Sequence, residues 1–416
     1  MAPSWVQHAI WWQVYPLGFT GAPIRTDHDA RDRFSHLEGW LDYAVELGAS
    51  GILLGPIFAS STHGYDTTDY LTIDPRLGTE ADFDRFVDSC SQRGLRVVLD
   101  GVFNHVGRSH PWVEDVILRG SESPYADLLE WREGKDGPKF GVFEGHDALV
   151  NLRHSGMETV AEVERVMKYW LGRGIDGWRL DAAYAVPPSF WARVLPRVRQ
   201  DFPDAWFVGE VIHGDYAEIA AESTLDSLTQ YELWKAIWSS LVDRNYYELA
   251  ASLERNDVFL DAELPLTFIG NHDVSRIASL VGPSGAVLAL TVLLTVGGTP
   301  SLYYGDEHGY LGEKLERIGG DDDVRPLFPP TPNDLGVLGE ETYRLHQELI
   351  ALRRRNSWLS SSRTKLVSVD NEAIEYDAVS TLGDDTLRVS LSLLGGYSAS
   401  ITAPDGDVLF RYSSSD

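Results

Sequence analysis

The chain alternates short apolar runs with stretches of helical periodicity from its start to about residue 355. Eight apolar runs predict strands, at 10–15, 51–54, 96–99, 177–180, 206–209, 227–230, 266–269 and 301–304. The segments between them predict helices at 34–47, 80–93, 158–173, 188–200, 231–254, 284–296 and 340–354. Alternating strands and helices are typical of a parallel sheet, and eight such units favour a closed (β/α)₈ barrel over a doubly wound sheet.

Two regions break this rhythm. Residues 100–158 show no convincing barrel element and are rich in Gly, Ser, His and Pro, which is typical of a functional loop or a small subdomain. After about residue 362 come alternating runs separated by GD and DGD turns: TKLVSV, AIEYDAV, TLRVSLSLL, YSASITA and DVLFRY. We therefore predict an α/β fold with a (β/α)₈ barrel (1–104 and 156–358), a short inserted domain B (105–155) and a small C-terminal antiparallel β domain (359–416).

The composition of the chain argues against some classes of binding partner. A formal net charge of −28 over 416 residues argues against nucleic acid and anionic membranes, whose recognition needs clustered Lys and Arg. The longest apolar run, 286–296, is too short to span a bilayer and predicts a buried helix. The N-terminus lacks the basic and apolar regions of a signal peptide, and Cys90 is the single cysteine, so we expect a cytoplasmic protein without an intramolecular disulfide.

Polar side chains follow five of the predicted strands. In barrels of this class the active site lies at the carboxyl ends of the strands. A single Asp or Asn at such a place often only begins a turn, but five strand ends on one face predict a site. The residues are His63, Tyr65, Asp66 and Asp69 after the second strand, Asp100, Asn104 and His105 after the third, Arg179 and Asp181 after the fourth, Glu210 after the fifth, and Asn271, His272 and Asp273 after the seventh.

Asp181 and Glu210 end adjacent strands. Neighbouring strands lie about 4.8 Å apart, which fits the roughly 5–5.5 Å between the two carboxyl groups of a retaining glycosidase. Arg179 is expected to keep Asp181 ionised by lowering its pKa. The apolar neighbours of Glu210 would raise the pKa of its carboxyl group, which suits a general acid. Asp273 approaches from the far side, where it would hold sugar hydroxyls as charge develops at the anomeric carbon.

Four motifs, DGVFNH (100–105), GWRLDA (177–182), GEV (209–211) and FIGNHD (268–273), resemble the strand-end motifs of the α-amylase family (glycoside hydrolase family 13). GTPSLYYGDE (298–307) is similar to the family's eighth-strand segment, and ALVNLRH (148–154) to a motif late in its domain B. The resemblance covers about residues 8–355 and implies a retaining enzyme on a (β/α)₈ barrel. The roles it implies are Asp181 as nucleophile, Glu210 as acid/base, Asp273 as transition-state stabiliser, Arg179 paired with the nucleophile, His105 and His272 bound to sugar hydroxyls, Tyr65 stacked on the sugar, and Asp100 as structural support.

The positions at which the sequence differs from the family pattern bear on the size of the substrate. Ala183, Tyr184 and Ala185 stand where polymer-cutting relatives often carry Lys-His, so we expect fewer polar groups on the leaving-group side. Asp66 stands at a position where many polymer-cutting relatives have Trp. In relatives that act on short sugars, an Asp at this position pairs with an Arg near the eighth-strand loop. Arg325 matches that Arg, which predicts an Asp66–Arg325 pair closing the site into a pocket. The alternative is an Arg325 bonded to one of its own aspartates at 321–323.

Calcium is left open. Many relatives bind Ca²⁺ through the Asn of the DGVFNH motif, but calcium takes six to eight oxygen ligands, and residues 106–150 hold no convincing Asp-rich cluster. We expect Asn104 to serve as a hydrogen-bonding anchor and expect no essential metal or cofactor, with a structural calcium as the alternative.

The predicted function is retaining hydrolysis of α-glucosides in short α-glucans or disaccharides, through a covalent glycosyl-enzyme, with an oligosaccharide as the small-molecule partner. Two alternatives stay open: a transglycosylase or isomerase of the trehalose-forming type, and an endo-acting α-amylase or cyclomaltodextrinase. A non-catalytic family member is disfavoured, because all three acids are present. The linkage cut and the oligomeric state are not determined by the sequence.

Overall fold

The computed structural model describes residues 2–25, 29–317 and 319–414. The eight predicted strands form one parallel sheet in the order β12-β11-β10-β5-β2-β1-β14-β13. A parallel bridge between Thr229 and Leu266 joins the two end strands, so the sheet curves into a nearly closed barrel. The (β/α)₈ barrel is thus confirmed. Its strands are β1 (Trp11–Val14), β2 (Gly51–Leu54), β5 (Arg96–Gly101), β10 (Gly177–Leu180), β11 (Trp206–Gly209), β12 (Ser227–Leu228), β13 (Leu266–Phe268) and β14 (Thr299–Tyr303).

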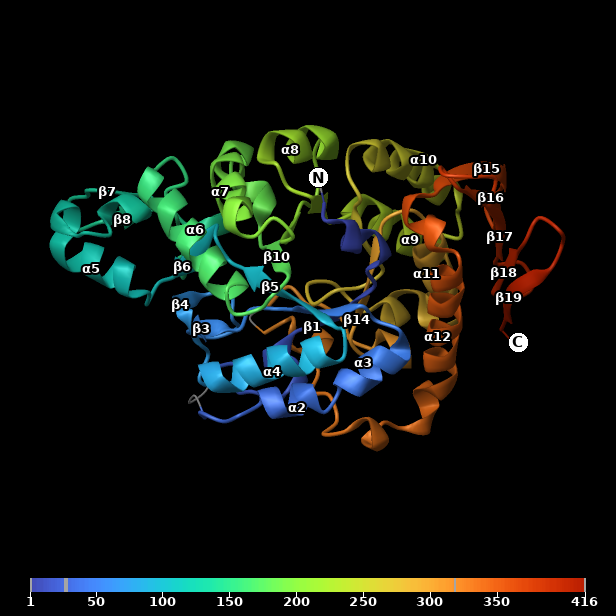
Figure 1. Cartoon of the computed structure of the whole chain (residues 1–416), viewed down its shortest axis with the longest axis horizontal. Helices are drawn as coiled ribbons and strands as arrows, with labels where there is room; N and C mark the ends of the chain where they lie inside the picture. The colour runs from blue at the N-terminus through green and yellow to red at the C-terminus, as the bar shows by residue number, and fades with distance from the viewer. Residues whose placement is uncertain (1, 26–28, 318, 415–416) are drawn as a thin grey trace.

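Helices surround the barrel (Figure 1). They are α2 (Phe34–Glu38), α3 (Leu41–Leu47), α4 (Glu80–Gln92), α6 (Met157–Leu171), α7 (Pro188–Asp201), α8 (Tyr216–Ser223), α9 (Tyr231–Val242), α10 (Tyr247–Ala262), α11 (Ile277–Thr295) and α12 (Glu340–Arg355), with a short α1 (Pro16–Phe19) after β1. The predicted helix 34–47 is two helices, and so is 231–254, where the chain turns at Arg244 with φ +50°. α8 was missed by the periodicity.

Helix α11 is long and apolar enough to cross a membrane by length and composition alone, with a mean hydropathy of 2.0. It begins before the predicted residue 284 and bends at Gly282, where φ is +72°. Its residues from Gly285 to Thr295 are all buried, and Thr295 Oγ1 lies 2.6 Å from the hydroxyl of Tyr376 in the C-terminal sheet. The apolar surface of α11 is therefore covered inside the protein, as predicted for this run.

Two segments extend the barrel. Between β5 and β10 the chain forms small antiparallel pairs and one helix: β6 (His105–Gly107), α5 (Pro111–Arg119), β7 (Trp131–Arg132), β8 (Lys139–Phe140) and β9 (Leu149–Asn151). A hairpin after β2, formed by β3 (Phe58–Ser60) and β4 (Thr67–Ile73), was not predicted. The C-terminal strands form the predicted antiparallel sheet in chain order: β15 (Arg363–Val369), β16 (Ala373–Val379), β17 (Thr386–Ser392), β18 (Ser398–Thr402) and β19 (Val408–Ser413). In Figure 1 the inserted segment and this sheet lie at opposite ends of the long axis.

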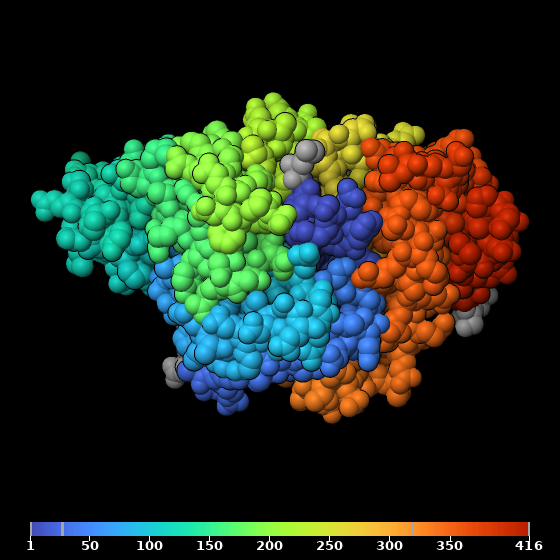
Figure 2. All heavy atoms as spheres, in the orientation of Figure 1, coloured from blue at the N-terminus to red at the C-terminus, as the bar shows by residue number. Residues whose placement is uncertain are grey.

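A separate apolar cluster fills the end of the barrel where the strands begin. The indole of Trp11 stacks on that of Trp206 with centroids 5.1 Å apart and planes 3° from parallel, and both side chains are fully buried. The short helix η1 (Ser4–His8) contributes Val6 to this cluster. Figure 2 shows the N-terminal segment, in dark blue, in the middle of the face toward the viewer.

Trp11→Ala is expected to lower the free energy of unfolding by about 3–5 kcal/mol, because it removes a large buried side chain and leaves a cavity beside Trp206. Denaturant unfolding followed by circular dichroism measures this change. Leu338→Ala is the matched control, since Leu338 is 99% exposed and its truncation should change stability by less than about 0.5 kcal/mol. Equal stabilities for the two variants would contradict the assignment of this stack to the core.

Candidate active site

The barrel interior changes from apolar to charged along β5, β10 and β11. Successive side chains of a strand alternate between faces, so Val98 and Asp100 on β5 point to the same side, as do Arg179 and Asp181 at the end of β10. The parallel register sets Arg179 level with Asp100 on one neighbouring strand and with Val208 on the other, two residues before Glu210. The acids at these three strand ends therefore meet around Arg179.

The Arg179 guanidinium contacts three carboxylates. Its Nη1 donates to both oxygens of Asp100, each at 2.9 Å, and to Asp181 Oδ1 at 2.8 Å. Its Nη2 lies 2.6 Å from Glu210 Oε1. All four side chains are buried. Taking a charge out of water costs several kcal/mol per ion, and these charge-assisted hydrogen bonds offset that cost.

The two candidate catalytic acids share this cation, which the sequence did not predict. Arg179 was expected to act on Asp181 alone; in the structure it also contacts Glu210. Arg179 lowers the pKa of both carboxyl groups, as expected for Asp181, but burial outweighs this effect, so the pKa of Asp181 lies above its ordinary value rather than below it. For Glu210 burial raises the pKa to about 7, which confirms the direction expected from its apolar neighbours.

Two further groups orient the Glu210 carboxylate. The backbone N–H of Ala182 donates to Oε2 at 2.8 Å, and Ala182 takes a left-handed conformation with φ +45° to do so. The hydroxyl of Tyr231 donates to Oε1 at 3.2 Å and accepts from Asn271 Nδ2 at 2.9 Å. Sequence reasoning missed Tyr231, because it begins an ordinary amphipathic helix and belongs to no motif.

Asp273 is fixed from three sides. Its backbone N–H donates to Asn271 Oδ1 at 2.8 Å, His272 Nε2 lies 3.1 Å from Oδ2, and Arg325 Nη2 donates to Oδ1 at 2.9 Å. Burial alone would raise the pKa of Asp273, but His272, Arg325 and Arg179 together hold it below its usual range. Burial also lowers the pKa of His272 to about 3. Because this imidazole is neutral near pH 7, Arg325 is the adjacent permanent positive charge on Asp273.

Tyr65, His105 and His272 form a connected group. The Tyr65 hydroxyl donates to Asp100 Oδ2 at 3.0 Å and also contacts His272 Nε2, and the two rings stack at 5.4 Å. His105 Nε2 lies 3.0 Å from the Tyr65 carbonyl oxygen, and burial lowers the pKa of His105 to about 4. Both imidazoles are therefore neutral near pH 7, and the ring nitrogens of each contact groups of the protein.

The predicted Asp66–Arg325 pair is not formed among the described residues. Asp66 accepts hydrogen bonds from the Thr62 backbone N–H at 3.0 Å and from its hydroxyl at 2.7 Å. Arg325 instead donates to the His272 carbonyl and to Asp273, and its Nη2 lies 3.4 Å from Asp321. The alternative, a surface Arg325 bonded to an aspartate of 321–323, is met only in part, because Arg325 is buried, its hydrogen-bonded carboxylate is Asp273, and Asp321 lies at ion-pair distance. The predicted pair does not form because Asp66 accepts hydrogen bonds from Thr62 in a local turn, while Arg325 bonds to the carboxylate of Asp273.

These groups surround a cavity of about 440 Å³. Seven of the predicted residues line it: His63, Tyr65, His105, Asp181, Glu210, Asp273 and Arg325. Arg179, His272 and Asp66 are buried and are not among the lining residues. The lining also includes residues that the sequence did not single out for the site, namely Phe143 and Glu144 from the inserted segment, and Tyr184, Tyr231, Trp234, Lys314 and Asp321.

The leaving-group side is more polar than predicted. Tyr184 was expected to remove polar groups there, but its hydroxyl donates to Glu144 Oε1 at 2.8 Å across the cavity. Glu144 has φ +49°, an uncommon conformation for a residue other than Gly, which places it at the tip of the inserted loop. Phe143 beside it stacks on His105 with centroids 4.9 Å apart. The inserted segment therefore contacts both sides of the cavity.

The expected role of Asn104 agrees with its contacts. Asn104 Nδ2 lies 3.1 Å from His105 Nδ1, so the amide fixes the orientation of that imidazole. In the part of the chain that the structure describes, no group of three or more His, Cys, Asp or Glu side chains is arranged to hold a metal ion.

Comparison with known proteins decides the family. The α-amylase catalytic-domain model matches residues 13–329. The chain is 30% identical to a cyclomaltodextrinase of Geobacillus thermopakistaniensis over 94% of its own length and 70% of that protein's. It is 31% identical to neopullulanase 2 of Thermoactinomyces vulgaris, with 94% and 70% covered. The chain belongs to the α-amylase family of glycoside hydrolases.

The solved structures of the α-amylase family agree with this fold. The cyclic α-maltosyl-(1→6)-maltose hydrolase of Arthrobacter globiformis superimposes over the full length of both chains with a TM-score of 0.84 and 25% identity. A debranching enzyme of Nostoc punctiforme gives a TM-score of 0.81 at 25% identity, covering 99% of this chain and 97% of that one. The protein is thus a glycoside hydrolase with the fold that the sequence predicted.

Arg325→Gln is expected to lower kcat/KM by about 10- to 100-fold, because Asp273 loses a charge-assisted hydrogen bond worth roughly 1.5–3 kcal/mol. Arg325 lowers the pKa of Asp181 as well as that of Asp273, so without this cation both carboxyl groups protonate at higher pH and the acid limb of the kcat/KM profile should move to higher pH. A pH series with a chromogenic α-glucoside measures both effects. Arg344→Gln, an exposed control in α12, should leave the profile unchanged. An unmoved acid limb in Arg325→Gln would contradict this role.

Proposed function

We propose that the protein hydrolyses α-glucosidic bonds of short or cyclic maltooligosaccharides with retention of anomeric configuration. The observation that carries this proposal is the shared contact of Asp181 and Glu210 with Arg179 at the wall of a sugar-sized cavity. Two carboxyl groups so placed suit the two steps of a retaining glycosidase.

In the first step Asp181 attacks the anomeric carbon while Glu210, protonated near neutral pH, gives its proton to the leaving glycosidic oxygen. The bond to the leaving sugar breaks as the bond to the Asp181 carboxylate oxygen forms. In the second step Glu210 takes a proton from water, and the water oxygen displaces Asp181 from the anomeric carbon. Asp273, kept ionised, stabilises the positive charge that builds on the sugar in both transition states.

Two observations favour compact substrates. The Glu144–Tyr184 hydrogen bond joins the inserted segment to the residues after β10 in the cavity lining, on the side that would take the leaving sugar. Beyond Asp273, Asp321 lies 3.5 Å from Lys314 and 3.4 Å from Arg325, forming a charged wall. The names of several relatives point the same way: they include cyclomaltodextrinases, a maltogenic α-amylase from Bacillus acidopullulyticus (31% identical, 64% of its length covered) and a cyclic α-maltosyl-(1→6)-maltose hydrolase.

Asp181→Asn is expected to lower kcat by about 10⁴-fold or more on every α-glucoside, because the nucleophile is lost. Maltose, maltotriose, a cyclodextrin and starch should be incubated with both enzymes, with early products followed by NMR. The wild type should release α-anomers, from the short and cyclic substrates faster than from starch. Asp136→Asn, an exposed control, should behave as wild type. Full activity of Asp181→Asn, or β-anomers as the first products of the wild type, would contradict the retaining mechanism. Transfer products formed with an added acceptor sugar would favour the transglycosylase instead.

The wild-type activity should fall as the pH rises above about 7, because Glu210 loses the proton that it must donate. The acid limb should lie lower, where Asp181 and Asp273 become protonated. Glu210→Gln should remove the alkaline limb and lose activity least on substrates with a good aryl leaving group, which need no proton. An alkaline limb that persists in Glu210→Gln would assign the proton donor to another residue.

Glu144→Ala and Tyr184→Phe should each lower kcat/KM for maltose or maltotriose by about 5- to 30-fold, since each loses a hydrogen-bonding group on the leaving-group side. The same variants should change kcat/KM for an aryl α-glucoside less than about twofold, because no sugar occupies that side. Glu133→Gln, exposed in the same inserted segment, is the control. Equal losses on both substrates would show that the pair acts on the fold rather than on the leaving sugar.

A further inference from the structure

The described residues include six buried arginines, Arg33, Arg76, Arg179, Arg276, Arg325 and Arg353. Five of them contact a carboxylate: Asp29, Asp74, Asp100, Asp306 and Asp273 respectively. Arg353 makes no ion pair within the described part of the chain. A buried cation without an anionic partner is costly, and it is unexpected in a chain with 63 acidic residues and 35 basic ones.

Backbone carbonyls offset part of the positive charge of Arg353. Its Nη1 donates to the carbonyls of Leu294 and Val296 at 3.0 and 2.9 Å, and its Nη2 to that of Gly298 at 2.6 Å. These carbonyls lie at the end of α11, where the helix dipole supplies about half a negative charge. Burial lowers the pKa of the Arg353 guanidinium to about 9, and no nearby acid opposes this shift. The guanidinium is still charged at neutral pH, and the half charge of the helix end compensates only part of that charge.

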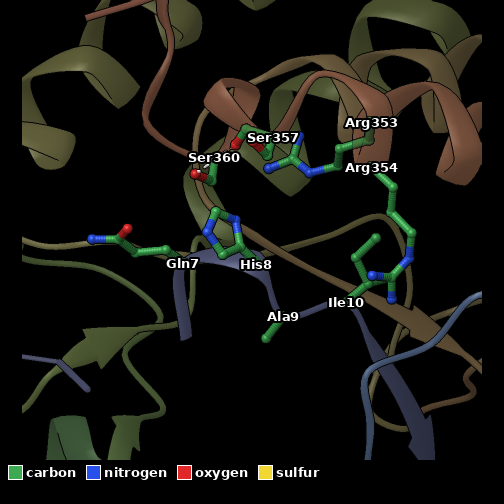
Figure 3. Close-up of a pocket in the computed structure, with 8 residues that line it drawn as sticks. All are labelled: Gln7, His8, Ala9, Ile10, Arg353, Arg354, Ser357 and Ser360. Carbon is green, nitrogen blue, oxygen red and sulfur yellow. Dashed lines mark hydrogen bonds between the residues drawn. The ribbon is translucent and has the colours of Figure 1, made fainter. Parts of the chain in front are cut away.

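Arg353 lines a cavity at the opposite end of the barrel from the active site. The cavity measures about 270 Å³ and is lined by Gln7, His8, Ala9, Ile10, Arg353, Arg354, Ser357 and Ser360, none of them acidic. Figure 3 shows the Arg353 guanidinium turned toward Ser357 and His8, and that of Arg354 turned toward Ile10. These residues come from η1, the C-terminal end of α12 and the following η10 (Ser357–Ser361).

Donors remain free around this cavity. Arg354 uses Nε and Nη2 on the Gly48 carbonyl and on Ser50 Oγ. Within the described residues, Arg353 Nε and Arg354 Nη1 have no hydrogen-bond acceptor. The imidazole of His8 and the hydroxyl of Ser357 also line the cavity, and each is able to donate a hydrogen bond to an anion. The forks of both guanidinium groups are taken by backbone carbonyls and Ser50, and the N–H groups left over, at Arg353 Nε and Arg354 Nη1, are charged donors of the kind that bind phosphate oxygens.

We propose that this cavity is a binding site for a phosphate-type oxyanion, which acts as the counterion of Arg353 and Arg354. The two guanidinium groups hold the oxyanion, with Ser357 and His8 at its edge. The cavity exceeds the size of a bare phosphate, so it also takes a phosphate carried by a small sugar. Its place at the N-terminal face of the barrel ties the site to stability rather than to the reaction.

The direct test is calorimetric titration of the full chain with inorganic phosphate and with a hexose phosphate, with chloride at matched ionic strength as the reference. One saturable site is expected for phosphate. The melting temperature should rise by about 3 °C when phosphate reaches about 100 times its Kd, from the linkage of binding to folding. A stronger response to the hexose phosphate identifies the larger ligand, and equal responses identify the free anion.

Two variants locate the site. Arg354→Gln should weaken phosphate binding by about 10-fold or more, because a charge-assisted hydrogen bond is lost. Ser357→Asp should place a carboxylate beside both guanidinium groups, raising the melting temperature in chloride and abolishing the phosphate response. Arg344→Gln, on the same helix but away from the cavity, should bind phosphate as the wild type does.

Two results would overturn the proposal. The first is equal melting temperatures in phosphate and chloride with no saturable heat of binding. The second is phosphate binding that Arg354→Gln and Ser357→Asp leave unchanged, which would place the anion elsewhere. Neither result bears on α-glucoside hydrolysis, because the readouts are binding and stability.

Discussion

The active site depends on one buried guanidinium. Arg179 contacts Asp100, Asp181 and Glu210 at once, and no other described residue forms an ion pair with these three carboxylates. Burial raises the pKa of each of these carboxyl groups, and the neighbouring carboxylates raise it further, against the lowering by Arg179. For Glu210 the pKa rises to about 7, so its carboxyl group keeps a proton close to neutral pH, as an acid catalyst needs.

The barrel architecture supplies this geometry. Parallel register aligns Arg179 with Asp100, and the next strand ends at Glu210. The apolar cluster around Trp11 and Trp206 fills the opposite end of the barrel and holds the strands in that register. The inserted segment completes the site from outside, where Phe143 stacks on His105 and Glu144 bonds to Tyr184.

Much of this could be predicted from the sequence, because it follows from periodic or local signals. Strand-helix alternation gave the barrel, and acids directly after apolar runs located Asp181 and Glu210. Contacts between distant segments were not predictable in the same way. Glu144 and Tyr184 are 40 residues apart and belong to no common pattern. Asp66 and Arg325 were paired by analogy with relatives, but Thr62 lies nearer to Asp66, and Asp273 takes Arg325. The pKa of Asp181 depended on burial, which its neighbours in sequence did not reveal.

The most direct measurement is kcat/KM of Arg179→Lys on an aryl α-glucoside, with circular dichroism to verify the fold. A single ammonium on a flexible stem cannot replace a planar fork that contacts three carboxylates. We expect a loss of about 10²–10³-fold in a variant that keeps the wild-type spectrum. Activity within about threefold of wild type in a folded Arg179→Lys would contradict the central role of this guanidinium.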